Sequence, residues 1–368
     1  MENCLSSCFK NTLVVTISNS PVSNNKNRCL VGKLQKKCRV LVAKYGGYSK
    51  YGYYEYNSCL NTPIEPVTPA GRYLSTVLLN ERKSFHDKVA ETLEELVADR
   101  DEAYLRMMVS GDGSTEACLH RRIAELKGNE CQTAVEDVMY MLILYKFSEL
   151  KVHLIPRLSK CIYNKRLEIL PSKDWELESI HSFEILEMIK QHLTSVIGWR
   201  SDFSVTDNWA TTKIKHHRLC QIYTGSILFG YFLKSASLRH RLEMSLVDPI
   251  DDMIFNKFRP KNLVFGNTCN MVTTSTFDSK KKRENLSSYL MGFALDSLAK
   301  CAQPNSKEAL NLIAKHTVAL FGDIESDEMI STSFSTLKRF VMEAIAFGSF
   351  LWDTEEYVTT VYNLQENK

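Results

Sequence analysis

The stretch FEILEMIKQHLTSVIG at residues 183–198 decides the fold, because a second version of it, KEALNLIAKHTVALFG, returns at residues 307–322. Each stretch has an apolar stripe at helical spacing, an acidic residue near its start and a glycine just past its end. Matching residues recur 124 positions apart, namely Glu184 and Glu308, His192 and His316, and Gly198 and Gly322. The sequence therefore predicts two copies of one helix, each ended by its glycine.

A second apolar block follows each copy, SILFGYFLKS at residues 226–235 and AIAFGSFLWD at residues 344–353. Gly230 and Gly348 hold the same place in these blocks and are 118 positions apart, so the connector is six residues shorter in the second copy. Surface loops tolerate such changes of length. We therefore expect a mainly α protein with two pseudo-repeated helix-loop-helix units, packed with helices from the N-terminal part.

Gly230 and Gly348 need an explanation, because glycine inside a helix costs about 1 kcal/mol relative to alanine. A small residue lies one turn before each of them, Ser226 and Ala344. Small residues on one face let two helix backbones approach closely, and we expect the repeats to pack through this face. The alternative is that the glycines make room for a ligand between the helices.

His192 and His316 are weak candidates for a ligand site, because they share one register in the two copies. Each copy has one histidine there, without a carboxylate or thiol at the spacing of metal ligands. We therefore expect two partly exposed helix histidines, no metal site and no cofactor. The chain also lacks the phosphate-binding, dinucleotide-binding, serine-hydrolase and zinc-protease motifs, so no catalytic residue is assigned.

Composition and helix-breaking residues divide the chain into a leader at 1–54, an N-terminal helical region at 66–150, a first repeat at 151–246, a linker at 247–284 and a second repeat at 285–368. Gly128 and Asn129 are expected to interrupt the N-terminal helices. Residues 152–170 are compatible with a small β-hairpin. The long helix of the first repeat is expected to begin near Lys213.

The leader is far more basic than the rest of the chain. Residues 1–54 contain nine lysines and arginines and one acidic residue, whereas the whole chain has a net charge of +3. A basic, acid-poor head is typical of a transit peptide, and its few arginines favour a plastid over a mitochondrial address. The alternative is a disordered basic tail. The mildly acidic remainder argues against nucleic acid as a partner.

Neither a membrane span nor a disulfide framework is expected. The longest apolar run, at residues 222–233, has twelve residues, whereas a membrane-spanning helix needs about 20. We interpret this run as a buried central helix. The eleven cysteines include no C-x-x-C pair, which favours reduced thiols.

Four strings carry a resemblance to a known family: RLSKCIYNKRLEILPSKDWELESIH at 157–181, TDNWATTKI at 206–214, LFGYFLKSASLRHRLEMSL at 228–246 and AFGSFLWDTEEYV at 346–358. They resemble the plant chloroplast UV-B-induced protein family, over roughly residue 69 to the C-terminus. The resemblance implies a soluble, mostly helical plastid protein associated with stress. The domain of this family, domain-of-unknown-function family 760, implies no catalytic residues.

Two functions stay open at this point. The first is a non-enzymatic interaction or regulatory protein of the chloroplast, with protein partners in the plastid; a homo-oligomer is compatible with it. The second is a helical enzyme or small-ligand carrier with a pocket between the repeats. Exposed apolar patches would favour the first, and a cluster of buried titratable groups in a cleft would favour the second.

Overall fold

The computed structural model describes residues 61–109, 115–169, 173–198, 210–247, 285–322 and 328–365. The predicted leader and nearly all of the predicted linker lie outside these ranges. The described chain is mainly helical, which confirms the predicted mainly α class. Its elements are α2 (Pro69–Asn80), η1 (Arg82–Ser84), α3 (Phe85–Val109), α4 (Thr115–Glu149), η2 (Leu158–Lys160), β1 (Ile162–Tyr163), β2 (Arg166–Leu167), α5 (Asp174–Glu178), α6 (Phe183–Ile197), β3 (Thr211–Lys215), α8 (His216–Val247), α10 (Leu286–Met291), α11 (Leu295–Ala302), α12 (Lys307–Phe321), β4 (Met329–Ser333) and α13 (Phe334–Val361).

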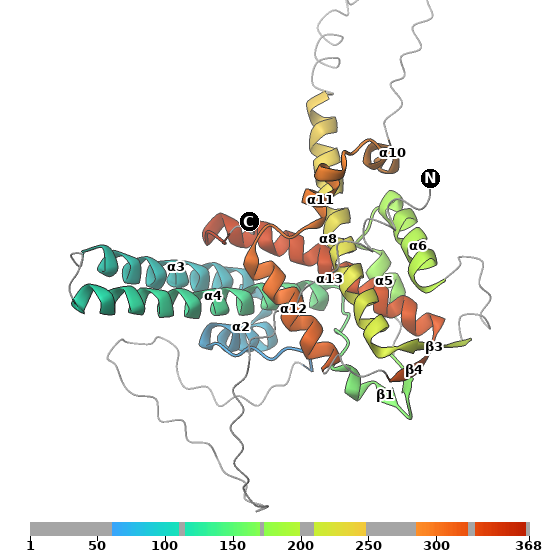
Figure 1. The fold of residues 1–368 in the computed structure, drawn as a ribbon, viewed down its shortest axis with the longest axis horizontal. Helices are drawn as coiled ribbons and strands as arrows, with labels where there is room; N and C mark the ends of the chain where they lie inside the picture. Colours follow the sequence, from blue (N-terminus) through green and yellow to red (C-terminus); the bar gives the residue numbers. More distant parts are fainter. Residues whose placement is uncertain are drawn as a thin grey trace, which may run out of the picture. The chain divides into compact units, whose positions relative to one another are not determined.

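Helices α8 and α13 pack against each other and form the core with α4 and α12 (Figure 1). Most of the run at residues 222–233 of α8 is buried, which confirms the predicted central helix. In α13, every residue from 339 to 351 is buried. A helix that is apolar on all sides needs neighbours around it, and α8 and α13 supply part of that cover to each other.

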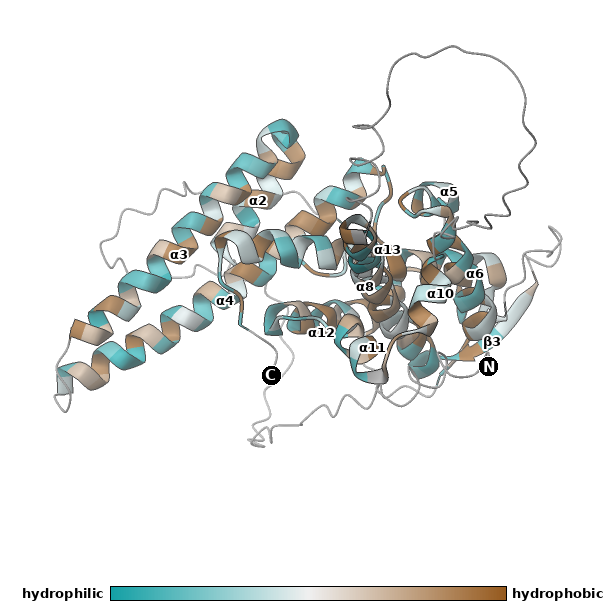
Figure 2. Ribbon diagram, turned by 90° about the horizontal axis from the view of Figure 1, so that it is seen from above, coloured by the Kyte–Doolittle hydropathy of each residue, from teal (hydrophilic) through white to brown (hydrophobic). Residues whose placement is uncertain are grey.

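Helix α4 is continuous through Gly128 and Asn129, so the predicted interruption is wrong. A glycine costs a helix only about 1 kcal/mol, and packing of α4 against α2 and α3 outweighs that cost. Figures 1 and 2 both show the outer ends of α3 and α4 side by side, with no other labelled element next to them.

Four short strands form one sheet among the described residues, in the order β1-β2-β4-β3. Strands β1 and β2 form the predicted hairpin, whose two turn residues have the positive φ angles of a type I′ turn. The sequence analysis does not predict strands β3 and β4. Because β3 pairs with β4 at Thr211–Lys215, α8 begins at His216 and not near Lys213. Isoleucine and two threonines favour a strand here.

Helices α6 and α12 have 15 residues each and begin and end alike. The hydroxyl groups of Ser182 and Ser306 accept hydrogen bonds from the amides three residues later, which caps each helix. Gly198 and Gly322 follow the last residues, both at φ 71°, where glycine is favoured. Strands β3 and β4 have five residues each and lead directly into α8 and α13, 118 positions apart.

Candidate functional site

Gly230 in α8 and Gly348 in α13 lie where the two helix backbones touch. A Cβ atom added at Gly230 would be 2.0 Å from the carbonyl oxygen of Ile345, and one at Gly348 would be 1.9 Å from that of Ile227. No side chain fits at such distances. Ile227 and Ile345 are also 118 positions apart, so the two contacts are reciprocal. The glycines therefore allow the close approach of α8 and α13 and do not line a cavity.

His192 on α6 and His316 on α12 each stack on a phenylalanine of a long helix. The ring centroids are 4.2 Å apart for His192 and Phe229 and 4.3 Å apart for His316 and Phe347. The two phenylalanines are again 118 positions apart. Within the described ranges, no group of three histidine, cysteine or acidic side chains is arranged to hold a metal ion.

His316 is fully buried, so the expectation of a partly exposed histidine is wrong for it, whereas His192 is partly exposed. The reason is that α12 packs on both α4 and α8, which places Tyr140 and Tyr223 beside the ring. Burial lowers the pKa of His316 to about 3, and that of His192 to about 4. Both rings are therefore neutral at neutral pH.

A buried ion pair lies beside His316 in the core. Nη2 of Arg339 is 2.9 Å from Oε2 of Glu343, one turn further along α13, and both side chains are almost wholly buried. The two carboxylate oxygens also accept the backbone N–H of Ile155, at 3.0 and 3.1 Å, and Oε1 accepts the hydroxyl of Tyr223 at 3.4 Å. This pair therefore joins α13 to α8 and to the segment that follows α4.

Tyr223 links the ion pair to His316, whose Nε2 is 3.1 Å from the tyrosine oxygen. A carboxylate is the stronger acceptor, so we assign the hydroxyl proton to the bond with Glu343 and a proton to Nε2 of His316. Burial raises the pKa of Tyr223, and Glu343 raises it further, so the hydroxyl stays protonated. Burial also raises the pKa of Glu343, an effect that Arg339 opposes.

Tyr223, His316 and Glu343 have at most a trace of exposed surface, so this hydrogen-bonded chain is closed to solvent. The cluster can hold helices together, but it offers no face to a substrate. Sequence reasoning missed it, although one signal was available. An arginine and a glutamate four positions apart stand inside an otherwise apolar run, where unpaired charges are not tolerated.

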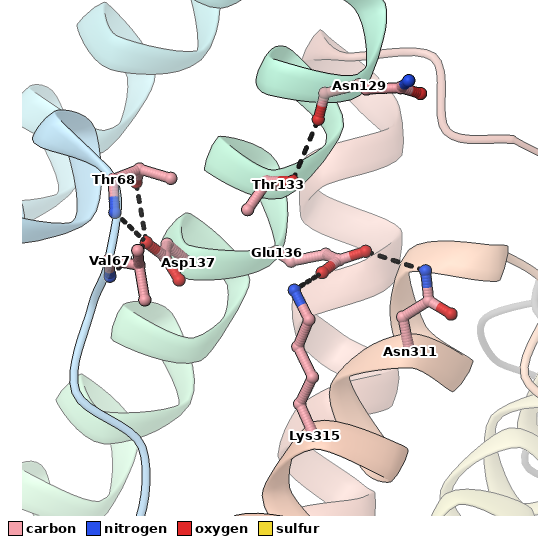
Figure 3. A network of polar contacts seen from close by, with 8 residues as sticks. All are labelled: Val67, Thr68, Asn129, Thr133, Glu136, Asp137, Asn311 and Lys315. Atoms are coloured by element: carbon pink, nitrogen blue, oxygen red, sulfur yellow. Dashed lines mark hydrogen bonds and ion pairs between the residues drawn. The ribbon is translucent and has the colours of Figure 1, made fainter. Parts of the chain in front are cut away.

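The adjacent carboxylates of Glu136 and Asp137 on α4 form polar contacts with segments on different sides of the helix (Figure 3). Oδ2 of Asp137 accepts the backbone N–H of Val67 and Thr68, at 3.0 and 2.8 Å, and the Thr68 hydroxyl at 2.7 Å. Glu136 accepts a hydrogen bond from Asn311 at 2.9 Å and pairs with Lys315, both on α12. Helix α4 is therefore fastened to the start of α2 and to α12.

Large apolar side chains are exposed at the outer end of the hairpin formed by α3 and α4. The small side chains of Ala103 on α3 and Cys131 on α4 are buried. The larger side chains are between 40% and 85% exposed: Leu105, Met108 and Val109 on α3, and Leu119, Ile123 and Leu126 on α4. We call these six residues the hairpin end. Such a concentration of apolar surface is typical of a binding site.

No helix in the described ranges is long and apolar enough to cross a membrane. No solved structure matches the chain. A family model described as Protein of unknown function (DUF760) matches residues 118–246. The chloroplastic UV-B-induced protein of Arabidopsis thaliana is 33% identical over 332 residues, which cover 83% of this chain and 78% of that protein. The chain therefore belongs to the UV-B-induced protein family that its sequence resembles.

Proposed function

We propose that this protein is an interaction or regulatory protein of the chloroplast that takes part in the response to UV-B light. The Arabidopsis relative, which is named as chloroplastic and UV-B-induced, supports the location and the response. The basic composition of residues 1–54 supports the same address. The closed cluster around Glu343 supports a non-enzymatic role, because its titratable groups bind one another and not a substrate.

The hairpin end is the observation that carries this proposal. Leu119, Ile123 and Leu126 follow the i, i+4, i+7 spacing that places side chains on one face of a helix. An exposed stripe with this spacing fits the apolar face of a second helix. The partner is therefore a protein that presents an amphipathic helix to α4.

We further propose that α6, β3 and α8 form one copy, and that α12, β4 and α13 form the other. The equal lengths of the paired elements, the two serine caps and the reciprocal contacts of Gly230 and Gly348 support this. The register of β3 and β4 supports it too, because Lys213 lies opposite Ser331, its own equivalent 118 positions on. In this proposal the paired copies are the scaffold that carries the hairpin.

Acidic substitutions at the hairpin end test the interaction. The full chain is expressed in chloroplasts, as the parent and as the double variant Ile123→Asp and Leu126→Asp, and each is isolated with its bound partners. The amount of partner recovered with the double variant is expected to be at least about tenfold lower, since apolar anchors dominate such interfaces. The melting temperature of this variant should change little because both side chains are exposed. The matched control is Val318→Asp, an exposed apolar residue on α12.

The proposal would be contradicted if the same partners were isolated in equal amounts with the parent and with the double variant. Light scattering of the purified parent decides between a different protein and a second copy. A parent that is monomeric alone supports a different protein as partner. A dimer that the double variant dissociates would contradict that assignment and make the hairpin end a self-association surface.

The address is tested separately. Because residues 1–54 are basic and the remaining chain is acidic, we expect cleavage in the neighbourhood of residues 42–54 and accumulation in the chloroplast. N-terminal sequencing of the protein isolated from leaves measures this directly. An intact Met1 on the leaf protein would contradict it.

A further inference from the structure

An open pocket of about 370 Å³ lies where α10 and α11 pack on the last third of α8. This pocket does not include the glycine contact, since its first α8 residue, Arg239, lies nine positions after Gly230. The volume is within the range of small-molecule sites. The lining residues that carry polar or aromatic groups are Arg239, Glu243, Ser288, Tyr289, Phe293 and Ser297.

The guanidinium group of Arg239 is held in place at the edge of this pocket. Its Nε donates to Oε1 of Glu243 at 2.9 Å. Its central carbon lies 5.2 Å from the centre of the Phe293 ring, a cation–π contact. Four of the five N–H donors of an arginine lie on the two Nη nitrogens, which Glu243 does not engage. An arginine fixed in this way is prepared to bind an oxyanion with two parallel hydrogen bonds.

A second donor lies on the same wall. The hydroxyl oxygen of Tyr289 is buried and makes no hydrogen bond of good geometry among the described residues, although Glu243 and Arg239 lie close enough to shift its pKa. The ring is fixed between His240 and Phe293, with centroid distances of 4.7 and 4.8 Å. Burial, and then Glu243, raise the pKa of Tyr289 to about 12, so the group is an O–H donor at neutral pH. An oxyanion in the pocket would offer this hydroxyl an acceptor of better geometry than Glu243 does.

The acidic group nearest to the guanidinium, Glu243, contacts it at Nε. Glu243 pairs with Arg239, which lowers the pKa of the carboxyl group and keeps it ionised. Asp296 lies in the first turn of α11 but is exposed to solvent. The aromatic ring of Phe293 supplies the apolar part of the wall.

We propose that this pocket binds a small molecule through an oxyanion group, a carboxylate or a phosphate, with Arg239 and Tyr289 as its hydrogen-bond donors. The rest of the ligand lies against Phe293. This binding site is independent of the hairpin end.

The test uses the full chain and two probes, inorganic phosphate and acetate, each titrated at constant ionic strength with chloride as the reference. Dissociation constants come from calorimetry and from the rise of the melting temperature with anion concentration. We expect at least one probe to bind the parent, and Arg239→Gln to weaken that binding about tenfold or more. Tyr289→Phe, which removes only the hydroxyl, should weaken it several-fold.

Arg241→Gln is the matched control, because it removes an exposed cation two positions away and changes the net charge equally. It should bind the probe as the parent does. The proposal is overturned if neither probe binds the parent, if Arg239→Gln binds as well as the parent, or if Arg241→Gln loses as much affinity as Arg239→Gln. The hairpin variants Ile123→Asp and Leu126→Asp should leave the anion affinity unchanged, so the two proposals fail separately.

Discussion

Replacing Gly348 with alanine is expected to lower the free energy of unfolding by about 3 kcal/mol, the upper end of the usual cost of overpacking. The added Cβ would lie 1.9 Å from the carbonyl oxygen of Ile227, which belongs to a helix backbone and cannot rotate away. Helices α8 and α13 must therefore move apart and lose packing on both sides of the contact. Thermal and urea unfolding of the full chain measure the loss.

Two further variants sharpen this result. Gly128→Ala, in a helix with nothing within 4 Å of the new Cβ, should stabilise the protein by about 1 kcal/mol. Gly230→Ala should cost as much as Gly348→Ala because the contacts are reciprocal. The double variant should cost less than the two losses together, since one displacement of the helices relieves both clashes. An unchanged melting temperature for either single variant would show that the helices do not touch there.

Replacing Glu343 with glutamine is expected to cost about 3–5 kcal/mol, because it leaves the charge of Arg339 buried without its partner. The acceptor of the Ile155 amide is weakened at the same time. Calorimetry at neutral pH gives the change in the free energy of unfolding. The double variant Arg339→Met and Glu343→Leu should recover part of the loss, since it removes the unpaired charge but leaves the Ile155 amide and the Tyr223 hydroxyl without this acceptor.

The matched control is Glu243→Gln. Arg239 and Glu243 have the same order and the same spacing of four residues, but the side chains are 48% and 44% exposed. Removing the charge of Glu243 should therefore lower the free energy of unfolding by no more than about 0.5 kcal/mol. Equal costs for Glu343→Gln and Glu243→Gln would contradict the buried position of the first pair.

These two pairs also mark a limit of sequence analysis. Arg239 with Glu243 and Arg339 with Glu343 look alike as isolated motifs, and only the apolar residues between and after the second pair, at 340–342 and 344–348, indicate burial. Its third and fourth members come from other helices: Tyr223 is 120 positions from Glu343, and His316 is 93 positions from Tyr223. A network of this kind depends on how helices pack, which no local pattern records.

The helices themselves were more readily predicted. The apolar spacing and the terminal glycines predict α6 and α12, and the run at 222–233 predicts the centre of α8. The hairpin of β1 and β2 follows from local residues as well. Strand β3 does not, because its partner β4 lies more than 100 positions away and supplies the hydrogen bonds that decide between strand and helix. The continuity of α4 was missed for the same reason, since packing against other helices compensates for Gly128.

An unbroken α4 behaves mechanically as a lever. Its 35 residues make a rod about 50 Å long, and Ile123 lies about 20 Å along the axis from Glu136. A force on the outer end is not absorbed by a hinge at Gly128. The force is transmitted to Asp137, which accepts hydrogen bonds at the start of α2, and to Glu136, which accepts one from α12. Tension or torque on this arm would therefore be divided between α2 and α12.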